Sequence, residues 1–250
     1  IYDCVDRHSA YKGMINPKVV DEMEKDLASS ASYIFCTAAG LYDTLYQYNK
    51  NVTLIPNGAD YELFSKAAKF VPVKRSKPWP VFGFVGMLQE CIKYEWMEAL
   101  AKAFPKGELV LVGGELPGVD LTQLKKYSNI KFAGLVPQEE LPEIIGGFDV
   151  CLNLFRKGRL SKDVSPLKLY EYLATGKPVV STAEPLQALD YADVVYIAEN
   201  EEDFMLKCRE ALQEKDPSKS EKRMKYANEA SWDNRVMQME DILIGRGIFQ

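Results

Sequence analysis

The sequence lacks a cysteine pattern that would suit a disulfide framework or a zinc site. It has five cysteines, an odd number, and no C-x-x-C pair. Three of them lie within strand-like apolar runs, so we expect reduced thiols in the core of a cytoplasmic protein. The five are Cys4, Cys36, Cys91, Cys151 and Cys208.

Long apolar and long single-sign segments are missing as well. No apolar run approaches the roughly 20 residues that a membrane-spanning helix needs. The formal charge is only −5, from 31 basic and 36 acidic residues, with no long block of one sign. This argues against nucleic acid as the main partner.

The dinucleotide fingerprint G-x-G-x-x-G is also absent. Gly83 and Gly86 are spaced G-x-x-G, and the pair Gly113-Gly114 is not followed by the further glycine spacing of the fingerprint. This argues against a dehydrogenase. His8 is the only histidine, and a lone histidine is more often a surface or hydrogen-bonded residue than a catalyst.

A regular alternation of strand-like and helix-like segments fills residues 1–57. Such alternation is typical of parallel strands joined by crossover helices. We expect strands at Ile1–Val5, Tyr33–Thr37 and Val52–Pro56, and helices at Val19–Ser29 and Ala38–Tyr48. The chain begins on a strand, as we expect of a segment cut from a longer protein.

A second α/β unit is predicted after a basic, proline-containing linker at Lys66–Pro80. Expected strands are Val81–Gly86, Glu108–Gly113, Ile130–Gly134, Val150–Leu154, Val179–Thr182 and Val194–Ile197, and expected helices are Glu95–Ala103, Leu121–Tyr127, Gln138–Ile145 and Glu201–Gln213. The pattern predicts a doubly wound sheet, which binds ligands at the carboxyl ends of its strands. The glycine turns at Gly86, Gly113 and Gly134 would lie there.

The segment from Asp163 to Val180 predicts a loop, a helix and a buried strand. Ser165 suits the N-cap of the helix, and Pro166 suits its first turn. Apolar residues follow at the spacing of a one-sided helix, namely Leu167, Tyr170, Leu173 and Ala174. Gly176 suits the helix end. The helix would therefore present its positive N-terminal end to the loop.

Five basic residues fall within residues 156–168. They are Arg156, Lys157, Arg159, Lys162 and Lys168. A solvated basic loop would explain any one of them. Lys168 fits that explanation least, because a cation in the first turn of a helix is unfavourable unless an anion binds there. Glu171 lies three residues later, on the same side of the helix.

The run S-P-L-K-L-Y-E-Y-L-A-T-G-K-P-V-V resembles the donor-binding signature of the family 4 (group 1) glycosyltransferases. That signature has an acidic residue, seven others and a glutamate before A-x-G-x-P-V-V, and Asp163 and Glu171 fill the acidic places. The family usually has Glu at the first place, followed by Phe-Gly where this sequence has Ser165-Pro166. The variant resembles a polysaccharide-biosynthesis branch. An ordinary capped helix on a sheet would explain the apolar positions but not Lys168 and Glu171.

The resemblance implies an α/β, GT-B-like fold with a doubly wound, donor-binding C-terminal domain and a partial Rossmann-like N-terminal portion. Residues 1–57 would be the end of an acceptor-side domain whose earlier strands precede this sequence, and residues 58–232 the nucleotide-sugar-binding domain. Residues 233–250 would form a helix that crosses back, with Val236, Met239 and Leu243 on its packing stripe. Asn57-Gly58 would make the interdomain turn, although a simple strand-to-helix turn fits equally well.

The resemblance also implies a retaining glycosyltransferase of glycan or polysaccharide biosynthesis. A nucleoside-diphosphate sugar would be the donor, and a glycan, a lipid-linked molecule or a small molecule the acceptor. No D-x-D pair occurs, so we expect neither a metal nor another cofactor. A non-catalytic sugar-nucleotide-binding domain is the alternative. Contact with the inner face of the membrane would come through the missing N-terminal strands.

The resemblance assigns roles to particular residues. Glu171 would accept hydrogen bonds from the ribose hydroxyls, and the base would lie against the backbone at Val136. The candidate catalytic residues are Asp6, His8 and Asp163, near the donor sugar. The other expected donor-binding residues are Gly86, Arg156, Lys162, Ser165, Pro166, Leu167 and Lys168.

Overall fold

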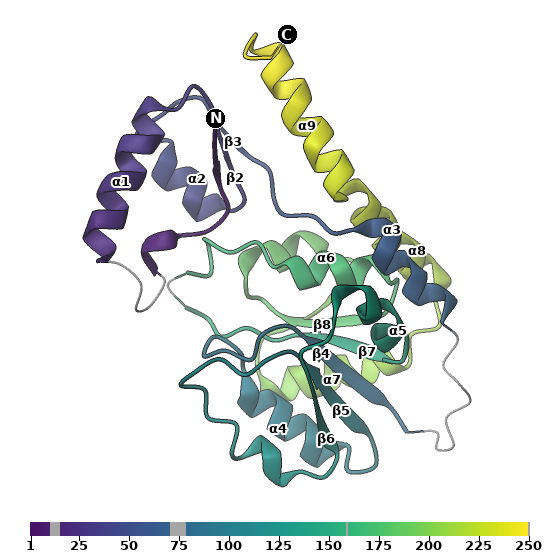
Figure 1. The fold of residues 1–250 in the computed structure, drawn as a ribbon. Helices are drawn as coiled ribbons and strands as arrows, with labels where there is room; N and C mark the ends of the chain where they lie inside the picture. The colour runs from purple at the N-terminus through teal and green to yellow at the C-terminus, as the bar shows by residue number, and fades with distance from the viewer. Residues whose placement is uncertain (11–15, 71–78, 159, 250) are drawn as a thin grey trace.

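The computed structural model describes residues 1–10, 16–70, 79–158 and 160–249. These residues form two parallel β-sheets with helices packed against them (Figure 1). The sheets arise from the two α/β segments that the sequence indicates, so the predicted α/β fold class is confirmed.

The N-terminal sheet has three strands in the order β1-β2-β3. Its elements are β1 (Tyr2–Cys4), α1 (Pro17–Ser30), β2 (Ile34–Cys36), α2 (Ala39–Leu45) and β3 (Val52–Leu54). Ile34 of β2 packs with Ala28 of α1 and Leu41 of α2 in one apolar cluster. Burial of these side chains fixes both helices on one face of the sheet.

The C-terminal helix α9 (Trp232–Gly245) covers the opposite face of that sheet. Leu243 of α9 packs with Tyr33 and Phe35, which flank Ile34 and therefore point the other way. The second half of the chain thus returns to the N-terminal sheet through this helix. Val236 is 51% exposed, so its expected place on the packing stripe is wrong. The helix meets the sheet mainly through its second half.

The larger sheet has six parallel strands in the order β6-β5-β4-β7-β8-β9. Its strands are β4 (Val81–Val85), β5 (Glu108–Val112), β6 (Ile130–Gly134), β7 (Val150–Asn153), β8 (Val179–Thr182) and β9 (Tyr196–Ala198). Its helices are α3 (Tyr61–Phe64), α4 (Tyr94–Ala103), α5 (Leu141–Gly146), α6 (Leu167–Ala174), α7 (Glu201–Leu212) and α8 (Pro217–Glu229). One apolar cluster joins α4 and α7 to one face, and another joins α5 and α6 to the opposite face.

The order of these strands creates a topological switch point between β4 and β7. From β4 the chain winds outward through β5 and β6, then returns to β7 and winds the other way. Connections leave the carboxyl ends of β4 and β7 in opposite directions, which opens a crevice there. The turn at Gly86 follows β4, and the loop that leads to α6 follows β7. Both features that the sequence singles out therefore lie at this edge.

Two predicted elements differ from the structure, and one helix of the structure had no predicted counterpart. The helix expected at Leu121–Tyr127 is only a short 3-10 turn at Leu124–Lys126, and the last strand begins two residues later than predicted, at Tyr196–Ala198. The helix α8 was not predicted. Only Arg223 and Ala227 are buried in it, so its sequence lacks the apolar stripe that indicates a helix.

The chain crosses between the two sheets twice, at adjacent places. Ala59 forms a parallel bridge with Ser231, and its N–H donates to the carbonyl of Ala230 at 3.2 Å. A Cβ at Gly58 would lie 2.4 Å from that same carbonyl oxygen, so the crossing needs a glycine.

All five cysteines are free thiols, four of them buried and Cys91 exposed. None forms a disulfide, and the expected place in the core is wrong for Cys91. Among the described residues, no helix combines the length and the apolar character needed to cross a membrane.

Candidate functional site

The helix α6 begins one residue later than predicted. Pro166 is its N-cap, and no side chain caps the helix. Ser165, the expected N-cap, bonds elsewhere: its hydroxyl accepts the N–H of Asn57 at 3.0 Å, and its carbonyl accepts the side-chain amide of Asn57 at 2.8 Å. The N-cap prediction is wrong because Asn57, at the crossing between the sheets, takes the Ser165 hydroxyl. This leaves the first turn of α6 without a side-chain acceptor.

Leu167 does not belong to the buried side of α6. Its side chain is 47% exposed, whereas Leu169, Tyr170, Tyr172 and Leu173 are buried. The buried positions run almost continuously because α6 packs against α8 as well as against the sheet. Leu167 precedes that packed section, so its expected packing is wrong.

Replacing Leu167 with Ser should change the free energy of unfolding by less than about 0.5 kcal/mol, because an exposed side chain makes few contacts to lose. Urea denaturation would measure this, with Leu206→Ser on α7, where the leucine is 50% exposed, as the matched control. A loss much larger than that of the control would contradict the exposed position of Leu167.

Lys168 extends from α6 to the turn after β4. Its Nζ lies 4.0 Å from the ring centre of Phe84 and 4.9 Å from that of Phe155. A Cβ at Gly86 would be 2.7 Å from this Nζ, so glycine provides the space for the ammonium group. Within the described ranges, the ammonium makes no hydrogen bond or ion pair. The two rings contact the charge without neutralising it.

Burial lowers the pKa of Lys168 to about 8, while Cys91 and Glu171 act weakly in the opposite direction. Burial likewise raises the pKa of Glu171 to about 7, and Lys168 partly opposes that shift. The carboxylate of Glu171 has no hydrogen-bond partner in the part of the chain that the structure describes. Two opposite, poorly solvated charges thus lie on one side of α6, each able to gain from a polar ligand.

The glycine turns at the strand ends pack backbone against backbone. Gly86 has a φ of +133°, which favours glycine, and its N–H donates to Val112 at 2.8 Å. Gly113 has a φ of +142°, and a Cβ there would lie 2.0 Å from the carbonyl oxygen of Gly86. The predicted meeting of these turns at one edge is confirmed.

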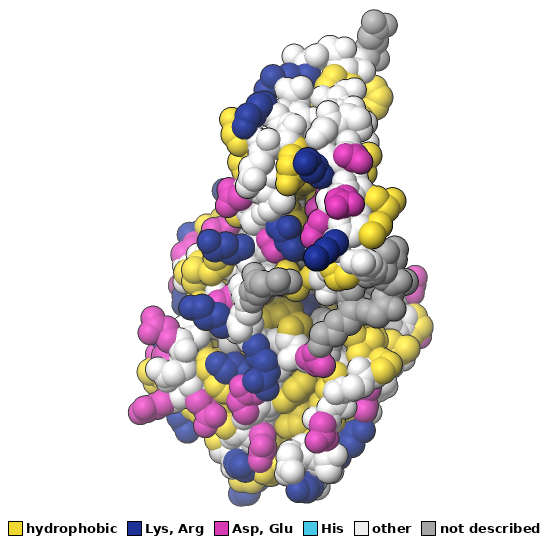
Figure 2. Space-filling model, turned by 90° about the vertical axis from the view of Figure 1, so that its left-hand side faces the viewer, with side chains coloured by type: hydrophobic (Ala, Val, Ile, Leu, Met, Phe, Trp, Pro, Cys, Tyr) yellow, Lys and Arg dark blue, Asp and Glu magenta, His cyan; other side chains and the backbone are white. Residues whose placement is uncertain are grey.

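An apolar rim borders the same edge. Leu135 is 76% exposed and Met87 is 37% exposed, and both side chains lie against Gly114. Val136 is half-buried and packs on the core. Figure 2 faces the side on which these strands end and shows Lys and Arg side chains beside hydrophobic ones. This edge thus offers both cationic and apolar contacts.

The loop before α6 holds the remaining basic candidates, and they differ in their contacts. Arg156 is paired: its Nη2 lies 2.6 Å from Glu95, and its Nε donates to the carbonyl of Ile92 at 3.0 Å. Lys157 and Lys162 are exposed. Arg159 lies outside the described residues. Lys168 is therefore the described basic candidate that faces the Gly86 turn.

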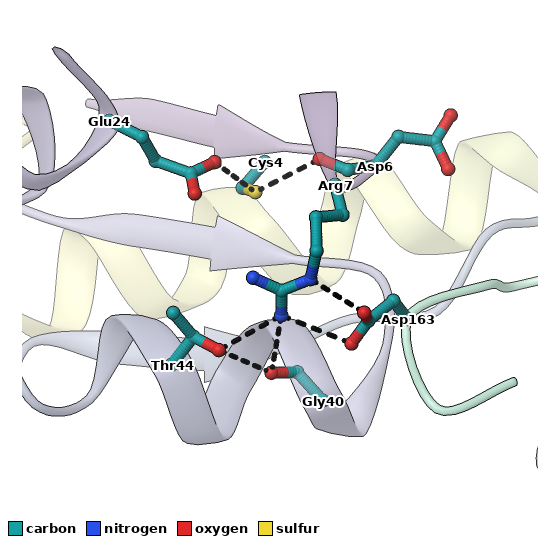
Figure 3. Close-up of polar contacts among 7 residues, drawn as sticks. All are labelled: Cys4, Asp6, Arg7, Glu24, Gly40, Thr44 and Asp163. Carbon is teal, nitrogen blue, oxygen red and sulfur yellow. Dashed lines mark hydrogen bonds and ion pairs between the residues drawn. The ribbon is translucent and has the colours of Figure 1, made fainter. Parts of the chain in front are cut away.

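The candidate catalytic residues Asp6 and His8 follow strand β1. Asp6 is half-buried, and its carboxylate points away from Asp163 (Figure 3). His8 is exposed, in a short 3-10 turn. The structure does not bring either side chain together with Asp163, and their catalytic role stays a prediction.

Asp163 instead pairs with Arg7, a residue that the sequence analysis missed. Nε of Arg7 lies 2.6 Å from Oδ2 of Asp163, and Nη2 lies 3.1 Å from Oδ1 (Figure 3). The hydrogen bonds to Asp163 raise the pKa of Arg7. Arg7 lies between the candidate residues Asp6 and His8 at the end of a strand. Its positive charge at this place was the feature of the sequence that could have identified it.

Among the described residues, no group of three or more His, Cys, Asp and Glu side chains could hold a metal ion.

Comparison with known proteins gives a consistent result. The family model for "Glycosyl transferases group 1" matches residues 79–214, more than half of the chain. A curated relative, the putative teichuronic acid biosynthesis glycosyltransferase TuaH of Bacillus subtilis (strain 168), is 27% identical over 93% of this chain. The chain spans only 64% of the length of that relative.

Solved structures show the same fold. Anabaena Alr3699/HepE, in complex with UDP and glucose, has a TM-score of 0.70 at 17% identity, covering 96% of this chain and 70% of that one. Sucrose-phosphate synthase from Thermosynechococcus elongatus has a TM-score of 0.67 at 19% identity, covering 93% of this chain and 62% of that one. At such low identities the likeness establishes a shared GT-B architecture.

Proposed function

The chain belongs to the group 1 glycosyltransferases, and from this we propose that it transfers a sugar from a nucleoside-diphosphate sugar to an acceptor in glycan or polysaccharide biosynthesis. The observation that carries the proposal is the pair Lys168 and Glu171. These opposite charges share one side of α6 beside the Gly86 turn, at the switch point where doubly wound sheets bind ligands. Burial favours the neutral form of each side chain, because it lowers the pKa of Lys168 and raises the pKa of Glu171.

Each residue matches a different part of the donor. The Lys168 ammonium and the first-turn N–H groups of α6, which no side chain caps, suit the diphosphate. The Glu171 carboxylate, one turn further along α6, suits the ribose hydroxyls. The rim at Leu135 and Val136 would contact the base. UDP and UDP-glucose are the ligands of a structural neighbour, which makes uridine nucleotides the first probes to use.

We propose that the reaction retains the configuration of the transferred sugar. Bond cleavage places negative charge on the departing diphosphate, and a fixed cation in a poorly solvated place stabilises such charge well. The acceptor would attack on the face that the diphosphate leaves, so positioning of the two substrates matters. We also propose a cytoplasmic protein with boundaries near residues 57 and 232, where the chain crosses between the sheets.

A thermal-shift panel of UDP, GDP, dTDP and ADP sugars tests donor binding. Release of the nucleoside diphosphate in the presence of glycan acceptors then tests transfer. We expect one nucleotide class to raise the melting temperature and to be consumed. Binding without turnover under every acceptor condition would favour a non-catalytic binding domain.

We propose that donor binding does not need a metal, because Lys168 and the α6 N–H groups can neutralise the diphosphate. The expected result is that the nucleotide raises the melting temperature equally with a chelator and with added magnesium or manganese. Stabilisation that appears only with a divalent cation would show this proposal to be wrong.

A further inference from the structure

The loop before α6 makes several hydrogen bonds with the N-terminal portion. Besides the bonds of Asn57 to Ser165, the N–H of Gly40 donates to the carbonyl of Lys162 at 2.8 Å. The side chain of Gln187 donates to the carbonyl of Thr37 at 2.8 Å. The N-terminal portion therefore contacts this loop at Lys162 and Ser165, immediately before the helix that carries Lys168 and Glu171, and also contacts the turn after β8 at Gln187.

Arg7 contributes an ion pair to these contacts between the N-terminal portion and the loop before α6. Its guanidinium bonds both oxygens of Asp163, and its Nη2 also donates to Thr44 Oγ1 at 2.9 Å and to the carbonyl of Gly40 at 3.2 Å (Figure 3). A guanidinium is a rigid fork, so these bonds fix its plane relative to α2. The Arg7 and Asp163 side chains are only 20% and 10% exposed, which limits screening by solvent.

Gly40 fits against Asp163 so closely that no side chain could replace its hydrogen. A Cβ at Gly40 would lie 2.1 Å from Oδ1 of Asp163 and 3.0 Å from Cβ of Lys162. The backbone of α2 therefore forms one wall of the place in which the Asp163 carboxylate is held. Two of the four lone-pair positions of this carboxylate receive the Arg7 bonds, which leaves others for further donors.

We propose that Arg7 is a positioning residue for sugar transfer: it fixes Asp163 and, through it, the loop before α6 relative to the N-terminal portion. Transfer needs the donor on α6 and an acceptor held by the other portion in one geometry, and Arg7 links the two. Nucleotide binding by Lys168 and Glu171 involves α6 and the C-terminal sheet alone. The inference rests on the proposed function. It predicts that loss of Arg7 lowers turnover and leaves the affinity for the nucleotide almost unchanged.

The experiment compares Arg7→Met, Arg7→Lys and the unchanged full-length protein, with UDP-glucose, or the sugar nucleotide that the panel selects, as the probe. We expect Arg7→Met to lower kcat about 10- to 100-fold, the scale for misplaced reacting groups. The affinity for the nucleotide, from calorimetry, should stay within about threefold. Arg7→Lys, which can bond one carboxylate oxygen, should restore part of kcat. Arg209→Met, an exposed arginine on α7, is the matched control.

A second variant disturbs the same contact with both charges retained. Gly40→Ala should displace Asp163 and lower kcat as Arg7→Met does. Gly245→Ala on α9, where an added Cβ meets nothing within 4 Å, is its control. Dividing kcat by the fraction of protein that binds nucleotide removes any effect of misfolding.

Equal kcat in Arg7→Met and the unchanged protein would overturn the positioning role. So would a loss of nucleotide affinity that accounts for the whole loss of turnover. If the unchanged protein neither binds nor consumes any sugar nucleotide, the proposed function itself fails, and that result is distinct from either of the other two.

Discussion

Replacing Lys168 with Met should weaken the binding of a nucleoside diphosphate about 10- to 100-fold, the scale for losing a hydrogen bond to a charged group. The free protein should be as stable as before or slightly more stable. Burial lowers the pKa of Lys168 to about 8, so the protonated lysine costs folding free energy at pH values below that. Methionine keeps the aliphatic stem between Phe84 and Phe155 and removes the charge. The contacts of Lys168 with the two rings offset part of this gain.

Calorimetric titration with UDP and with uridine separates the roles of charge and base. The variant should lose affinity for UDP and keep its affinity for uridine, since only UDP carries phosphates. Lys125→Met, which removes a surface lysine paired with Glu115, is the control for the loss of one positive charge. Equal UDP affinity in Lys168→Met and the unchanged protein would remove Lys168 from the site.

Replacing Glu171 with Ala should weaken the binding of UDP-glucose by about 1.5–3 kcal/mol, because a charged acceptor for the ribose hydroxyls is lost. The melting temperature should hardly change, since Glu171 has no hydrogen-bond partner in the described part of the chain. Glu221→Ala on α8, an exposed glutamate, is the control. A large loss of stability with unaltered affinity would assign Glu171 to packing.

The pH dependence of binding gives Glu171 a second, independent readout. The pKa of Glu171 is raised to about 7, so the carboxylate is the minor form below that pH in the free protein. Binding through the carboxylate should therefore strengthen as the pH rises through about 7, and weaken again as Lys168 loses its proton above about 8. In Glu171→Ala the rise in affinity through about pH 7 should disappear, and in Lys168→Met the fall in affinity above about pH 8 should disappear. An unchanged profile in both variants would contradict the assignment.

Periodicity and turn chemistry in the sequence determined most of the two sheets. The strands predicted from apolar runs bounded by glycine and proline all occur, because a buried parallel strand needs such a run and such ends. The helix α8 escaped prediction because its contacts involve Arg223 and Ala227, which form no apolar stripe. Leu167 and Val236 were predicted to be buried but are exposed. Periodicity finds the apolar side of a helix, but it does not tell how far along that side the neighbouring sheet or helix packs.

The sequence by itself also determined that Lys168 and Glu171 share one side of a helix, since residues three apart on an α-helix are neighbours. Only the tertiary structure decided what lies opposite Lys168: the Gly86 turn and the Phe84 ring come from another strand. Burial in the folded chain also shifts the pKa values of both Lys168 and Glu171. The same holds for Asp163. Its partner Arg7 is 156 residues away, and a contact across that separation depends on how two sheets pack, which no local pattern encodes.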